Sequence, residues 1–140
     1  MTKLKTQMLK LKVAKFIDAV NFLELAKKEI ERYDKTGNYY YLHQAGNKLY
    51  NAHIYLIELI KGQEVISNRQ VIELGRTIAK RNKLFNKIRF NVLAFHKWFY
   101  EGTEDERETK NRMQQTIKDM EKLLNKLYIP LKGEMDDLAK

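Results

Sequence analysis

Hydrophobic residues recur along this chain at steps of three and four, which is the spacing of one face of an α-helix. From residue 6 to residue 33 they form a single apolar stripe, which ends near a turn-forming stretch at residues 34–38. A second segment, residues 39–60, is apolar over a wider arc, as is typical of a helix in the middle of a bundle. The only proline is Pro130, and most glycines fall between the periodic segments. The pattern therefore predicts long helices and no sheet.

Two later helices are indicated by capping boxes, in which Ser or Thr accepts a backbone hydrogen bond and Gln or Glu reaches back. The boxes span Ser67–Gln70 and Thr103–Glu106. The third helix is expected over residues 68–101. The fourth helix has one apolar face and one charged face. Short connections favour neighbouring helices that run antiparallel. The prediction is one all-α domain over residues 1–140, an antiparallel (up-and-down) four-helix bundle, or five helices if the third is broken near residues 80–83.

A helical wheel of the third helix, drawn as one continuous helix at about 100° per residue, separates three groups of side chains. The core-facing group is Leu74, Ile78, Phe85, Ile88, Val92, Phe95 and Phe99. The opposite, solvent-facing group is the basic stripe Arg76, Lys80, Lys83 and Lys87, available to a phosphate backbone. The third group, Phe90, Leu93 and Trp98, projects away from the core-facing group. Because so many large apolar side chains are unusual on a monomer's surface, a homodimer through this helix is expected.

Composition and charge narrow the classes of function. The chain has 140 residues, of which 44% are hydrophobic and 32% charged, as in a soluble globular protein. The absence of cysteine excludes disulfides, thiolate metal sites and cysteine nucleophiles. Charges interrupt the basic N-terminal segment, and no uncharged apolar run approaches the roughly 18 residues of a membrane span. We expect a cytoplasmic protein that does not bind a membrane.

The net charge of +9 is unevenly distributed. Seven basic residues and no acidic one lie between Glu73 and Glu101, and a second basic patch lies near the N-terminus. Surfaces of one sign attract polyanions, of which nucleic acid is the commonest. A solvated, lysine-rich helix face is the alternative interpretation.

One stretch, RFNVLAFHKW at residues 89–98, carries candidate chemistry. Arg89 and His96 differ by only about 20° on the helical wheel, so they lie two turns apart on one side, with Tyr100 beside them. His titrates near neutral pH and can relay a proton, while Arg can stabilise developing negative charge. Equally, His96 could bond a neighbouring helix at the bundle edge while Arg89 pairs with Glu58 or Glu101.

At these residues the sequence resembles the HEPN superfamily, helical bundles that often carry an Arg, four to six residues and a His on a late helix. Residues 22–31 (FLELAKKEIE) and 41–60 (YLHQAGNKLYNAHIYLIELI) resemble the first two helices of that family. Trp98 supplies the aromatic residue that follows the motif, whereas Asn91 stands where an Arg of shorter spacing would lie.

The resemblance implies a function as well as a fold. In catalytic members, the motif helices of two protomers pair and cleave RNA without a metal. The resemblance would give Arg89 and His96 the catalytic roles, with Asn91 or Tyr100 orienting the substrate. The basic stripe would then follow the RNA backbone without distinguishing bases. We expect a HEPN-like, RNA-associated domain and a candidate metal-independent endoribonuclease, a toxin or defence component with a possible cognate protein partner.

The alternative is a non-catalytic helical bundle that binds a nucleotide or a protein partner. No cofactor or metal is expected, because His43 and His53 are ten residues apart and lack the spacing of helical metal ligands. Both are predicted to lie at the edge of the core. The sequence carries no Gly-rich phosphate loop, serine elbow or paired catalytic carboxylates, so common metabolic enzyme classes are unsupported.

Overall fold

The computed structural model describes residues 3–101 and 105–140, apart from the side chains of residues 98–101. Within these residues the chain forms helices and no strands, which confirms the all-α prediction. There are five of them: α1 (Lys3–Thr36), α2 (Tyr40–Lys61), α3 (Asn68–Arg81), α4 (Lys83–Glu101) and α5 (Glu106–Ala139). The expected third helix is thus broken inside the predicted 80–83 window.

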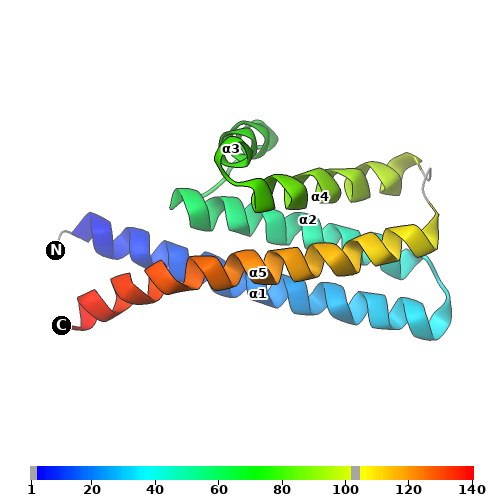
Figure 1. Cartoon of the computed structure of the whole chain (residues 1–140), viewed down its shortest axis with the longest axis horizontal. Helices are drawn as coiled ribbons and strands as arrows, with labels where there is room; N and C mark the ends of the chain where they lie inside the picture. The colour runs from blue at the N-terminus through cyan, green and yellow to red at the C-terminus, as the bar shows by residue number, and fades with distance from the viewer. Residues whose placement is uncertain (1–2, 102–104) are drawn as a thin grey trace.

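Four long helices, α1, α2, α4 and α5, run alternately up and down, and α3 lies across one side of them (Figure 1). Both chain ends lie at the same end of the bundle (Figure 1). α2 packs against all four other helices, as its wide apolar arc predicted. Gly46 lets α4 and α5 approach α2 closely, because a Cβ at Gly46 would lie 3.3 Å from Met113 Cε and 3.4 Å from Phe95 Cβ.

The predicted core face of the third helix is confirmed for its described members. Phe85, Ile88 and Val92 are fully buried, and Phe95 is 1% exposed. Each such side chain contributes roughly 1.5–3 kcal/mol by leaving water. The side chain of Phe99 lies outside the described residues. Burial of this stripe therefore fixes which side of α4 faces α2 and α5, and which sides remain for function.

Asn82 breaks the third helix by capping two helices at once. Its backbone is extended (φ −133°, ψ 103°), and its N–H donates to Ile78 O at 3.0 Å, closing α3. Its side-chain Oδ1 accepts a hydrogen bond from Phe85 N–H at 2.9 Å, opening α4. One extended residue redirects the chain, so a single wheel across residues 68–101 is wrong. Residues of α3 and α4 that share a side of that wheel therefore need not share a surface.

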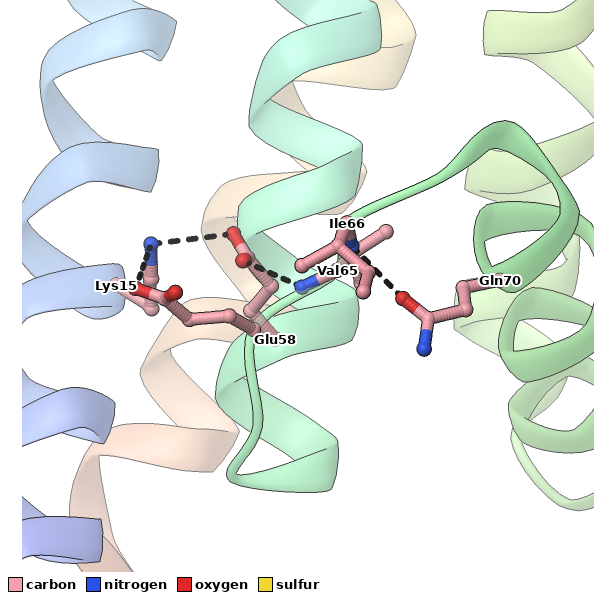
Figure 2. A network of polar contacts seen from close by, with 6 residues as sticks. Lys15, Glu58, Val65, Ile66 and Gln70 are labelled. Carbon is pink, nitrogen blue, oxygen red and sulfur yellow. Dashed lines mark hydrogen bonds and ion pairs between the residues drawn. The ribbon is translucent and has the colours of Figure 1, made fainter.

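A buried carboxylate holds the connection between α2 and α3 (Figure 2). α2 ends at Gly62, whose φ of +67° is a left-handed conformation that glycine adopts without strain. Glu58 Oε2 then accepts a hydrogen bond from Val65 N–H at 2.9 Å. Its other oxygen, Oε1, lies 3.4 Å from Lys15 Nζ of α1. The connection is thus tied to two helices before α3 begins.

The predicted capping boxes met different outcomes. Ser67 caps α3 by accepting from Gln70 N–H at 3.2 Å, as predicted, while Gln70 Oε1 accepts from Ile66 N–H at 2.7 Å (Figure 2). The second box is wrong as the start of α5. The N-cap is Asp105, which accepts from Arg107 N–H at 3.1 Å, and Thr103 lies outside the described residues.

Candidate nucleic-acid interface

A basic pocket of about 350 Å³ lies between α3 and α4. α3 contributes Arg76, Ala79 and Lys80, and α4 contributes Asn86 and Arg89. All three charged residues of the lining are cations. α4 adds no acidic residue in its first turn, so the positive end of its helix dipole is not offset there. We call this site the α3–α4 pocket.

Arg89 is half-buried in this pocket and packs directly on α3. Its Nε lies 3.1 Å from the point where a Cβ on Gly75 would stand. Within the described part of the chain, no carboxylate forms an ion pair with Arg76, Lys80 or Arg89. Glu58, one of the partners considered for Arg89, pairs with Lys15 instead. The side chain of the other, Glu101, lies outside the description.

Beneath Arg89, α2 places a buried histidine. His53 is 1% exposed, and its Nδ1 lies 3.3 Å from Tyr50 O. Its Nε2 is buried without a hydrogen-bond partner among the described residues. Burial lowers the pKa of His53 to about 4; its backbone contact with Tyr50 opposes that shift, and the charge of Arg89 adds to it. His53 is therefore neutral near pH 7.

His43 lies at the edge of the core, as predicted. It is half-buried, its ring meets that of Tyr39 edge-on at 5.0 Å, and burial lowers its pKa. The predicted placement at the core edge is confirmed for His43, whereas His53 is buried within the core. Among the residues that the structure describes, no cluster of three His, Cys, Asp or Glu side chains could hold a metal ion.

His96 is exposed on α4, two turns beyond Arg89. Its ring stacks on that of Tyr50, with centroids 5.0 Å apart and planes 22° from parallel. At 1.5 Å per residue, the backbones of Arg89 and His96 are about 10.5 Å apart along the helix axis. Arg89 reaches toward Gly75 and the α3–α4 pocket. Within one chain, the Arg89 guanidinium and the His96 ring therefore lie at separate positions along α4.

Other predicted site residues face elsewhere. Lys87 Nζ lies 3.4 Å from Oδ2 of Asp119, a buried residue of α5. Asn91 Oδ1 accepts a hydrogen bond from Arg112 Nη2 of α5 at 3.1 Å. Both therefore take part in the α4–α5 contact. All four residues of the predicted basic stripe are exposed, as predicted. Arg76 and Lys80 line the α3–α4 pocket, whereas Lys83 lies outside its lining and Lys87 also pairs with Asp119.

The expected apolar projection from α4 is confirmed for two of its three residues. Phe90 is 69% exposed and Leu93 is 37% exposed. The side chains of Trp98 and Tyr100 lie outside the described residues. Phe90 and Leu93 point away from the core and lie on the same helix as Arg89 and His96. The arrangement leaves a surface of α4 open to contact with another molecule.

Sequence reasoning missed Asn86 and the partnership of Arg89 with α3. Neither has a local signal, since both depend on the angle that the break at Asn82 creates. In the described parts of the chain, no helix is both long enough and apolar enough to cross a membrane. This chain matches no family model, no curated protein and no solved structure.

Proposed function

We propose that this chain is an RNA-associated helical domain that binds the phosphate backbone through the α3–α4 pocket. The observation that carries the proposal is the convergence of Arg76, Lys80 and Arg89 from two helices on one pocket without an acidic residue in its lining. Arg and Lys contact phosphate oxygens in most protein–nucleic acid complexes. Asn86 adds an amide that can donate to a phosphate or ribose oxygen.

The charge of the surrounding surface supports this proposal. Neither α4 before Glu101 nor the part of α3 after Glu73 has an acidic residue, so both helices that line the pocket add only cations around it. The resemblance of the Arg89–His96 motif to the HEPN superfamily favours RNA over other polyanions. Binding that rests on phosphates carries little base information, so we expect weak sequence preference.

The test compares two double variants that remove equal charge. Arg76→Gln/Lys80→Gln removes two cations from the pocket, whereas Lys122→Gln/Lys126→Gln removes two exposed lysines of α5. Binding of a labelled single-stranded RNA is measured by fluorescence anisotropy at several salt concentrations. Loss of two phosphate contacts makes the negative slope of log binding constant against log salt concentration shallower by about 1.4 for a single strand. Equal effects of both double variants would contradict the proposal.

A second candidate function is metal-independent RNA cleavage by a homodimer. It is favoured by the exposed position of His96 on the same side of α4 as Arg89, with Tyr50 holding its ring. Because Arg89 and His96 are about 10.5 Å apart along α4, one scissile phosphate would require Arg89 of one copy and His96 of another. The exposed Phe90 and Leu93 supply an apolar contact for that pairing.

Cleavage is tested on RNA in the presence of EDTA. His96→Ala and Arg89→Ala should each abolish cleavage while sedimentation still shows a dimer. Persistent cleavage by the purified double variant, or a wild-type protein that binds RNA and never cleaves it, would reject this second function. The latter result leaves a non-catalytic domain that binds a nucleotide polymer or a protein partner.

A further inference from the structure

Gly75 lies buried in the middle of α3, where glycine is less favourable than alanine. Its backbone does not need glycine, because the positive-φ glycines among the described residues are Gly37 and Gly62. What distinguishes Gly75 is its neighbour. A Cβ there would lie 3.1 Å from Arg89 Nε, 3.4 Å from Arg89 Cδ and 3.7 Å from Ile57 Cδ1. The missing side chain makes room for Arg89.

Of the side chains around Gly75, that of Arg89 is the one that can move to relieve the crowding. Unstrained carbon contacts lie at about 3.5–4.0 Å, so a methyl group at Gly75 forces a displacement. Ile57 is fully buried on the inner side, and the start of α3 is tied to α2 and α1 through Val65, Glu58 and Lys15. The flexible side chain of Arg89 is the part that gives way, by a few tenths of an ångström. That movement shifts the guanidinium from its position against α3.

We propose that Gly75 is a positioning residue for the α3–α4 pocket: its bare backbone seats Arg89 against α3, so that the guanidinium converges with Arg76 and Lys80 on one phosphate. This inference rests on the proposed function of the pocket. A guanidinium recognises phosphate through a planar fork of N–H donors, so its orientation matters as well as its charge. A helix surface that lies flat against the arginine supplies that orientation.

The chain offers a matched control for this proposal. Gly133 also lies within a helix, α5, and a Cβ there would meet nothing within 4 Å. Gly75→Ala and Gly133→Ala therefore make the same chemical change, with the same gain in helix propensity. Only the first presses on Arg89. Thermal unfolding of both variants shows whether either has lost its fold.

Binding of single-stranded RNA across a salt series is the first measurement. We expect Gly133→Ala to bind as the wild type does. Gly75→Ala should bind at least threefold more weakly, with a salt slope lowered toward that of Arg89→Ala. Once Arg89 is already Ala, adding Gly75→Ala should change binding no further, because Gly75 acts through Arg89. Wild-type affinity in Gly75→Ala, or an equal loss with and without Arg89, would overturn the inference.

A second measurement separates this inference from the proposed function. If the wild type shows no salt-dependent binding to RNA, the proposed function fails, and the position of Arg89 is then decided by NMR. A nuclear Overhauser contact between Arg89 Nε–H and the α-protons of Gly75 is expected in the wild type. In Gly75→Ala the Arg89 Nε–H signal should move and its contact with α3 should weaken, while Gly133→Ala leaves both unchanged. An Arg89 signal that Gly75→Ala does not alter would refute the positioning role.

Discussion

Removing the buried carboxylate at residue 58 should destabilise the protein through the place where α3 begins. Glu58 is 4% exposed, and its two oxygens serve two segments: Oε2 accepts from Val65 N–H at 2.9 Å, and Oε1 lies 3.4 Å from Lys15 Nζ. Glu58→Ala removes both contacts. It also leaves the N–H of Val65 without its acceptor and Lys15 without its nearest acid.

The expected size of the effect follows from these contacts. A hydrogen bond to a charged group contributes about 1.5–3 kcal/mol, and breaking one side of a buried pair costs about 3–5 kcal/mol. Lys15 is only partly buried and retains Glu64 at 3.9 Å, so the pair contributes toward the low end. We expect Glu58→Ala to lower the free energy of unfolding by about 3 kcal/mol. Glu58→Gln keeps an acceptor for Val65 and should cost about half as much.

Urea unfolding followed by circular dichroism gives the free energy of unfolding of each variant. Hydrogen exchange shows which helices have lost stability. Glu64→Ala is the control, because Glu64 is an exposed acid that approaches the same lysine. Its effect should stay within about 0.5 kcal/mol, as for most exposed ion pairs. In Glu58→Ala, amides of α3 should lose protection before amides of α1 do. A loss below about 1 kcal/mol, or one equal to that of Glu64→Ala, would refute the role assigned to Glu58.

Three further predictions concern single residues. The pKa of His53 is about 4 in the folded chain, below its ordinary 6.5, so the unfolded chain binds a proton that the folded chain excludes. Stability should therefore fall as pH drops from 6.5 to 4, by about 3 kcal/mol, and urea unfolding of His53→Gln should lack this contribution. Lys87→Met should cost about 1–3 kcal/mol because it leaves buried Asp119 without its cation, whereas Lys83→Met should be nearly neutral; equal melting temperatures would contradict this. Gly46→Val should destabilise by about 2 kcal/mol through overpacking where α2 meets α4 and α5, and an unchanged urea midpoint would show that the helices can move apart.

The sequence was most informative where a single helix decides the outcome. Spacing at three and four residues identified the buried face of α4, because Phe85, Ile88, Val92 and Phe95 belong to one regular helix. The cap at Ser67 was equally local, since a side chain and a backbone N–H three residues on decide it. Such features depend on neighbours along the chain, which the sequence displays directly.

The candidate site depended on the angle between two helices, which spacing cannot supply. The helical wheel placed Arg89 on one side of α4, but nothing near it in sequence indicates that Gly75 lies against it. Lys87 is exposed, as the wheel indicates, yet it also pairs with Asp119, thirty-two positions later. The Arg89–Gly75 contact and the Lys87–Asp119 pair both follow from tertiary packing. The periodicity of residues 68–101 carries no information about that packing.

The break at Asn82 is what turns a row of charges into a pocket. On one continuous helix, Arg76 and Arg89 would be thirteen residues apart, or about 19.5 Å along the axis, and a single phosphate could not contact both. With Asn82 extended, α3 crosses α4 and the two arginines line the same space. The residue that ends one helix and starts the next thus sets the spacing of the cations. Under the proposed function, charge drawn together in this way would contact one phosphate group from several directions, whereas a linear stripe would contact successive phosphates one at a time.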